Sequence, residues 1–151
     1  KFSKERFKIF HPGGSIGQTL LLVKDVMLKG KKLPLINYKS NILKAIQTIS
    51  KKDLGLGIVI KNKFVIGVVT DGDIRRGAKK FSKKNKITTL MTKKPIYTSE
   101  SIPASKALSV MSEKKITTLL VSSDKDFKKN KAYFKPVGIL HIHSLLKYGI
   151  K

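Results

Sequence analysis

Apolar and polar positions follow two rhythms along the chain, and each rhythm occurs twice. In SNILKAIQTIS (residues 40–50) and IPASKALSVMS (residues 102–112), apolar side chains recur at helical spacing, which predicts two amphipathic helices. Each predicted helix is followed by a short apolar run, LGLGIVI (54–60) or ITTLLVS (116–122), and then by a turn and a second apolar run. Short apolar runs separated by turn residues are typical of paired strands.

The two halves of the chain therefore repeat one order of elements. Residues 24–36 are echoed by residues 88–98, and we expect each segment to hold the opening strand of its half. Each half ends in a predicted helix, at residues 72–80 and 143–150, and the second half carries a longer loop at residues 124–135. The order is strand, helix, strand, strand, helix. One such unit of about 60 residues leaves a sheet face bare, so two units are expected to stack around a common core.

The predicted fold class is α/β (α+β), with two βαββα repeats packed pseudo-symmetrically and the helices on one face of each sheet. We assign residues 23–80 to the first repeat and residues 86–151 to the second. Residues 1–22 differ from both repeats, because they are basic and pack a proline and three glycines into HPGGSIG. This composition predicts a turn or linker.

Composition narrows the function classes. The net charge of +24 attracts polyanions, but arginine occurs only at Arg6, Arg75 and Arg76, the lysines are scattered, and no nucleic-acid-binding motif is present. We therefore expect weak, salt-sensitive attraction rather than a specific nucleic-acid partner. The absence of cysteine excludes disulfides and thiolate metal sites and is compatible with the cytoplasm, where we expect the protein. No apolar run approaches the roughly 20 residues of a membrane helix, so we expect no contact with a membrane. We also expect no cofactor.

One octapeptide connects the pattern to a family. Gly67–Ile74 (GVVTDGDI) resembles the signature of CBS domains, and the tandem repeat over Val23–Ile150 resembles a CBS pair, or Bateman module. The resemblance implies a cleft between the repeats that binds a nucleotide or nucleotide-sugar. Thr70 would contact a phosphate and Asp73 would accept hydrogen bonds from ribose hydroxyls. The structural alternative is that this threonine and aspartate only cap a helix.

Three motifs point further within that resemblance. TDGDIRR (70–76), HPGGSIG (11–17) and LHIHSLL (140–146) together are similar to the C-terminal part of D-arabinose 5-phosphate isomerases. These enzymes join an N-terminal sugar isomerase (SIS) domain to a CBS pair and serve the synthesis of Kdo, a sugar of lipopolysaccharide or capsule. Residues 1–22 would then be the linker from a sugar isomerase domain that this chain lacks. His11 matches a catalytic histidine of the family, although a loop histidine is the simpler role without that domain.

The isomerase resemblance implies what the repeats do. The ligand would be CMP-Kdo, the end product of the pathway, or an adenine nucleotide. The repeats would form a homodimer, and the parent enzyme a tetramer. This fragment alone is not expected to be an enzyme. Two other functions stay open: a purely structural oligomerisation module with an empty cleft, and, on charge alone, a nucleic-acid-binding protein.

Arg75 and Arg76 follow Asp73 directly in a chain that otherwise uses lysine. A planar bidentate contact with phosphate explains them, and so does a solvated helix face or a salt bridge to Asp71 or Asp73. Because neighbouring helical residues point in different directions, at most one of the two arginines is expected to face the ligand.

The strands preceding these motifs offer further candidates. Thr117 and Thr118 correspond to Gly55 and Gly57 in the repeat, and we expect these four residues to line the two halves of the cleft. Glycine there would let a ligand ring approach the backbone. Packing near a sheet edge is the alternative.

The second repeat departs from the signature. It has His141 and Ser144 where the first has Thr70 and Asp73, which puts an equivalent second nucleotide site in doubt. His141 and His143 would lie on the same side of a strand and form a pH-sensitive wall of the cleft, without a third ligand for a metal ion. The candidate ligand-binding residues are Gly55, Gly57, Thr70, Asp71, Asp73, Arg75, Arg76, Thr117, Thr118, His141, His143 and Ser144.

Overall fold

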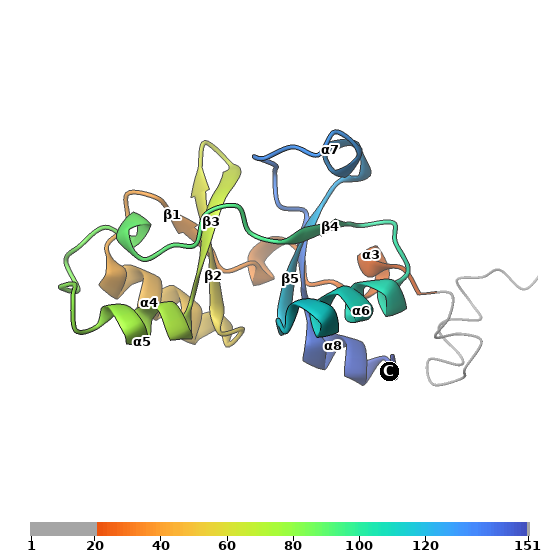
Figure 1. The fold of residues 1–151 in the computed structure, drawn as a ribbon, viewed down its shortest axis with the longest axis horizontal. Coiled ribbons are helices and arrows are strands. Elements are labelled where there is room, and N and C mark those ends of the chain that lie inside the picture. The colour runs from red at the N-terminus through yellow and green to blue at the C-terminus, as the bar shows by residue number, and fades with distance from the viewer. Residues whose placement is uncertain (1–20, 151) are drawn as a thin grey trace, which may run out of the picture.

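The structure, a computed structural model, describes residues 21–150, so His11 and the HPGGSIG segment lie outside the described residues. It contains two three-stranded sheets that lie side by side (Figure 1). One sheet has the order β1 (Leu35–Asn37), β2 (Leu56–Lys61), β3 (Phe64–Thr70) and the other β4 (Tyr97–Ser99), β5 (Thr118–Ser122), β6 (Gly138–His141). In each sheet the first pair is parallel and the second antiparallel.

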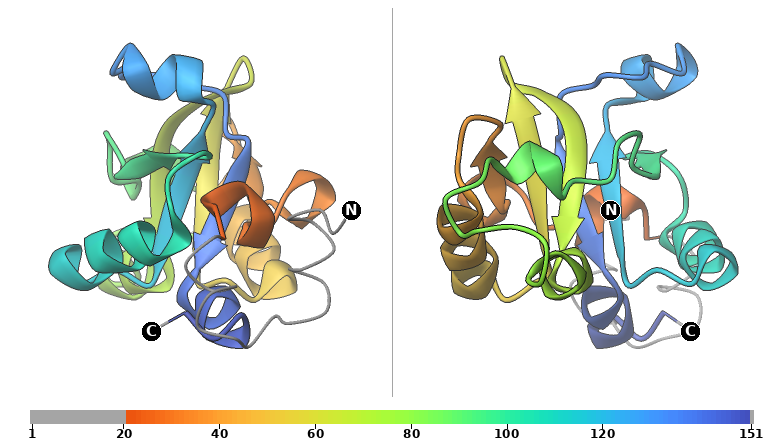
Figure 2. Two further views of the ribbon diagram at one scale, coloured as in Figure 1. Left: turned by 90° about the vertical axis from the view of Figure 1, so that its right-hand side faces the viewer. Right: turned by 60° about the vertical axis from the view of Figure 1, so that its left-hand side comes forward.

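Helices complete two βαββα repeats. The first repeat contains α4 (Ile42–Lys52) and α5 (Asp71–Gly77), and the second contains α6 (Ala104–Lys114) and α8 (Ile142–Lys147). The predicted element order and fold class are therefore confirmed. These four helices gather toward one end of the module, whereas the tip of the β2–β3 hairpin lies at the other (Figures 1 and 2). None of the helices between residues 21 and 150 combines the length and the apolar composition needed to cross a membrane.

Helix α4 forms where the sequence pattern predicts it. Its Asn41 N-cap accepts a hydrogen bond from the Lys44 amide at 2.9 Å, and its buried stripe consists of Ile42, Ala45 and Ile49. The helix ends at Asp53, which adopts the left-handed conformation with a φ of 54°. Helix α6 has a corresponding buried stripe and ends at Lys115 in the same left-handed conformation, but its N-cap Pro103 makes no side-chain cap hydrogen bond.

The long loop of the second repeat is not entirely a loop. The structure forms a short helix there, α7 (Asp124–Lys128), which the sequence analysis missed. Its charged sequence has no apolar stripe, and the helix begins because the Ser123 side chain accepts a hydrogen bond from the Asp126 amide at 3.3 Å.

The two repeats exchange their opening segments. Leu28, in the segment before β1, exchanges two backbone hydrogen bonds with Ile139 of the second repeat, at 2.8 and 3.0 Å. Thr92, in the segment before β4, does the same with Val68 of the first repeat, at 2.8 and 3.0 Å. Each repeat is thus completed by a segment that belongs in sequence to the other.

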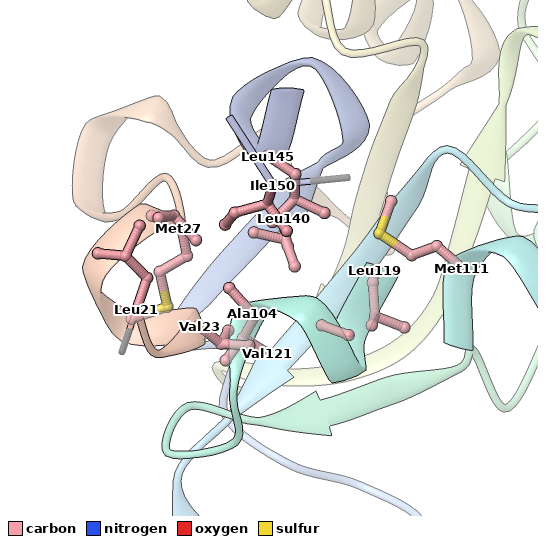
Figure 3. Packing of buried hydrophobic residues seen from close by; sticks show 12 residues of the cluster. Leu21, Val23, Met27, Ala104, Met111, Leu119, Val121, Leu140, Leu145 and Ile150 are labelled. Atoms are coloured by element: carbon pink, nitrogen blue, oxygen red, sulfur yellow. The ribbon is translucent and has the colours of Figure 1, made fainter. Parts of the chain in front are cut away.

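Helical turns take part in the same exchange. Helix α3 (Val23–Val26) packs into the core of the second repeat, whereas Ile87 of the 3₁₀ turn η2 (Ile87–Thr89) packs into the core of the first. A further 3₁₀ turn, η1 (Gly30–Lys32), precedes β1. Figure 3 shows Val23 and Met27 in one buried cluster with Ala104, Val121 and Leu140 of the second repeat.

A third apolar cluster joins the two sheets. It contains Ile58 and Val68 of the first repeat and Leu120, Phe134 and Ile139 of the second. The sheets therefore share a central core, and the other two clusters pack the helices of each repeat against its own sheet. This arrangement places the ends of β3 and the starts of β2 and β5 near one another, which positions the candidate site.

Candidate functional site

A cavity of about 480 Å³ lies between the two repeats. It is enclosed by the start of β2, the turn from β3 into α5, the segment before β4, and the start of β5. Its size falls within the range of small-molecule sites. The lining residues are Gly55, Leu56, Val68, Thr70, Asp71, Gly72, Asp73, Arg76, Thr92, Lys94, Pro95, Ile96, Lys115, Ile116, Thr117, Thr118 and Leu120.

Thr70, Asp73 and Arg76 form one hydrogen-bonded chain on this lining. Asp73 Oδ2 accepts from the Thr70 amide at 2.8 Å and from the Thr70 hydroxyl at 2.9 Å, while Thr70 Oγ1 accepts from the Asp73 amide at 3.1 Å. Arg76 donates to Asp73 Oδ1 at 2.7 Å. The helix-capping interpretation of the signature is therefore correct at the level of structure, and the same side chains also face the cavity.

One part of the lining consists of side chains that can form hydrogen bonds. Carboxylates of Asp71 and Asp73 lie beside the hydroxyl of Thr70, and Thr117 and Thr118 contribute from the other repeat. Acceptor-only carboxylates suit the hydroxyl pair of a ribose, because each hydroxyl can donate a hydrogen bond to them.

The rest of the lining combines apolar and cationic side chains. Its cations are Arg76, which is paired with Asp73, Lys94 and Lys115, and its apolar side chains are those of Leu56, Val68, Pro95, Ile96, Ile116 and Leu120. Apolar surface suits a flat base, and cations suit a phosphate.

Sequence reasoning missed part of this lining. Lys94, Pro95 and Ile96 reach the cavity because the exchanged segment before β4 crosses to the first repeat, where Thr92 pairs with Val68. Nothing local in the sequence marks them. Their place could be found only by assuming that residues 88–98 pack on the opposite repeat.

Two candidates in the first repeat do not line this cavity. Gly57 faces α4 and β1: a Cβ at this position would lie 2.2 Å from Ile36 Cδ1 and 3.2 Å from Ile49 Cγ1. The expectation that it gives a ligand access is wrong, because alternation along β2 turns it away from the cleft. Arg75 is exposed and also lies outside the lining, whereas Arg76 belongs to it.

His141, His143 and Ser144 are likewise absent from this lining, so the expected histidine wall does not belong to this cavity. The two histidines also do not share a strand, since His141 ends β6 and His143 lies in α8. Their rings still meet at a centroid distance of 4.8 Å, because His141 Nδ1 caps α8 by accepting from the His143 amide at 3.2 Å. Nowhere in residues 21–150 do three potential metal-binding side chains come together.

Burial and the neighbouring His143 shift the pKa of His141. Desolvation, and then the neighbouring His143, lower the pKa of His141 below its ordinary value, and Asp53 opposes them. The neutral ring is therefore favoured, which agrees with Nδ1 acting as a hydrogen-bond acceptor.

A comparison with known protein families shows to which family the chain belongs. The CBS domain family matches residues 23–80 and 87–151. The chain belongs to the CBS domain family. The signature resemblance of Gly67–Ile74 is thereby confirmed, and the cavity lies between the two members of a CBS pair.

Two curated proteins are similar to this chain over almost its whole length. An uncharacterized protein of Rickettsia prowazekii is 36% identical over 150 residues, which cover 99% of this chain. The arabinose 5-phosphate isomerase KdsD of Francisella tularensis is 35% identical over 153 residues, again 99% of this chain. The chain spans 44% of the length of each of these relatives, and it is homologous to the C-terminal part of such isomerases.

Solved CBS structures share the fold. A conserved protein from Pyrococcus horikoshii superposes with a TM-score of 0.71 at 23% identity, covering 88% of this chain and 95% of its own. CBSX2 in complex with AMP gives 0.69 at 21% identity, with coverages of 85% and 95%. The CBS pair of MJ0100, in complex with 5′-methylthioadenosine and S-adenosylmethionine, gives 0.69 at 22% identity, with coverages of 84% and 94%.

Proposed function

We propose that this CBS pair is the regulatory, nucleotide-binding part of an arabinose 5-phosphate isomerase. The observation that carries the proposal is the cavity between the repeats, where Thr70, Asp73 and Arg76 face an apolar slot and two further cations. A purely structural module has no need for this combination, because a buried apolar contact would join the repeats equally well.

Adenosine compounds are the first ligand class to test. CBSX2 and MJ0100 have the same fold and were solved with AMP, 5′-methylthioadenosine and S-adenosylmethionine. An adenosine group combines a flat base with a ribose, and the cavity offers apolar side chains and carboxylates to bind them. CMP-Kdo is the second candidate, since it shares the ribose and phosphate and would be the end product of an isomerase pathway.

The fold supports a route by which ligand binding could reach a preceding domain. Residues at the N-terminal edge dock on the second repeat: the Val23 amide donates to Ile102 O at 3.0 Å, and the Ala104 amide donates to Leu21 O at 2.9 Å. The cavity, by contrast, is lined by both repeats. A ligand that draws the repeats together therefore shifts the surface to which the N-terminal segment is attached.

Self-association through the outer helices is part of the proposal. Leu43 on α4 and Leu146 on α8 are 42% and 53% exposed. Exposed leucines on the outer helices of both repeats suit a homodimer interface, and a tetramer for the parent isomerase. The isomerase reaction itself, with His11, belongs to the parent protein.

Isothermal titration at physiological salt tests the nucleotide site. AMP, ATP, CMP and CMP-Kdo are titrated into the wild type, Asp73→Asn and Ser144→Ala. We expect saturable binding of one compound, lost in Asp73→Asn and kept in Ser144→Ala, whose position lies outside the cavity. Heat that disappears uniformly with added salt would overturn the proposal and favour an oligomerisation module with an empty cleft.

A further inference from the structure

A second groove, of about 590 Å³, lies at the end of the module away from the four main helices. It is formed by the β2–β3 hairpin, the segment before β4 and the loop between α7 and β6. The tip of the hairpin and α7 lie at the same end of the molecule (Figures 1 and 2). Its lining consists of Lys61, Asn62, Phe64, Ile66, Met91, Lys93, Lys94, Ala132 and Tyr133. We propose that this groove binds an amphipathic anion: a small molecule with an aromatic or aliphatic body and a carboxylate, phosphate or sulfonate head.

The apolar part of the groove is open to a ligand. Phe64 and Tyr133 are 43% and 61% exposed although both are large, and the half-buried Ile66 and Met91 belong to the same lining. Two exposed aromatic rings on one concave surface can both contact the body of a single bound molecule, so that apolar area is removed from water on binding.

The charge of the groove determines the sign of the charge on its ligand. Three lysines contribute, and the described lining includes no Asp or Glu. None of the ion pairs found among residues 21–150 involves Lys61, Lys93 or Lys94, so their charges are not neutralised by a neighbouring carboxylate. The cavity between the repeats differs, because it also has Asp71 and Asp73 to accept from sugar hydroxyls. The second groove therefore selects an anion without a requirement for ribose.

The loop between α7 and β6, which carries Tyr133, is held in place without a ligand. The ring of Tyr97 stacks on Phe134 at 4.2 Å, and the Tyr97 hydroxyl donates to Lys131 O at 3.0 Å. The Val65 amide donates to Phe134 O at 2.9 Å, which joins the loop to the hairpin. These contacts fix the backbone on the C-terminal side of Tyr133, so the groove does not have to be ordered by the ligand.

A matched pair of fluorescent probes tests the groove at physiological salt. 8-Anilinonaphthalene-1-sulfonate has an aromatic body and an anionic head, and N-phenyl-1-naphthylamine has the same body without the charge. We expect saturable binding of the sulfonate and several-fold weaker binding of the neutral amine. Lys93→Gln should weaken sulfonate binding about two- to fivefold, and Tyr133→Ala about two- to tenfold. Lys106→Gln, an exposed lysine on α6 outside the groove, is the matched control and should leave it unchanged.

Amide chemical shifts locate the bound probe. We expect the changes to cluster at Lys61–Ile66, Met91–Lys94 and Ala132–Tyr133. The proposal is overturned by equal affinities for the two probes, by an unchanged affinity in both groove variants, or by shift changes confined to the outer helices. The variants alter exposed side chains, and their thermal unfolding midpoints verify that they fold. No step of this test depends on nucleotide binding in the cavity between the repeats.

Discussion

Asp73 has a structural role that alters how its replacement must be interpreted. Its carboxylate accepts from the Thr70 amide at 2.8 Å, the Thr70 hydroxyl at 2.9 Å and Arg76 at 2.7 Å. Replacing Asp73 by Ala therefore breaks a capping box at the start of α5 as well as any ligand contact. Loss of ligand binding in this variant alone would not separate a sensor from a structural module.

The loss of folding free energy in Asp73→Ala can be calculated from those contacts. Asp73 is the N3 residue of the box, so its replacement removes the two hydrogen bonds from Thr70 but leaves the Thr70 cap on the residue-73 amide. Loss of these bonds costs about 0.5–2 kcal/mol of folding free energy. The ion pair with Arg76 adds little, because the arginine side chain is 70% exposed. At about 2–4 °C per kcal/mol for a chain of this size, we expect Asp73→Ala to lower the unfolding midpoint by about 1–8 °C without ligand.

Thermal unfolding followed by circular dichroism measures the effect. Asp71→Ala is the matched control, because Asp71 lies in the same turn and the same cavity but outside the capping box, so only a smaller helix-dipole effect is expected. An Asp73→Ala midpoint equal to that of the wild type would refute this reasoning and would mean that the carboxylate is not engaged in the free protein. Asp73→Asn keeps an oxygen acceptor for the cap and is therefore the better variant for ligand titration.

Three further predictions rest on other contacts. Gly67→Ala should lower the free energy of unfolding in urea by about 1–3 kcal/mol, because its Cβ would lie 2.8 Å from both Met91 Sδ and Thr92 O. Adding Met91→Ala should restore only part of this loss, since the contact with the backbone oxygen of Thr92 remains. The lowered pKa of His141 means that its stabilising contribution is present above the ordinary histidine pKa of about 6.5 and is lost as the pH falls from there through the lower pKa of the folded state. Unfolding midpoints between pH 8 and 5.5 should fall less in His141→Asn, and an identical slope would contradict this. Lys94→Gln should weaken both AMP and the sulfonate probe in titrations, because Lys94 lines both sites; a loss at one site only would show that the residue is not shared.

The candidate site was partly accessible from sequence. Thr70, Asp73 and Arg76 could be found because a short local signature places them on one strand-to-helix turn. Gly57 was assigned to the cleft incorrectly, because its side of β2 faces Ile36 and Ile49. Gly55 does line the cavity, but it precedes β2 and has a φ of 64°. Lys94 was missed because the approach of its segment to the first repeat depends on hydrogen bonds between Thr92 and Val68, which no local pattern reports.

The sequence by itself determined the repeated βαββα order, the amphipathic faces of α4 and α6, and the position of the signature at the start of α5. These features follow from side-chain periodicity and from contacts a few residues apart, which are written directly in the chain. Only the tertiary structure decided that the opening segments exchange between repeats. Gly67 and Gly138 leave room for Met91 and Met27, and that fit exists only once the strands from both halves are assembled. The exchange in turn brings Lys94 between the two candidate sites, because long-range backbone pairing rather than local preference sets its position.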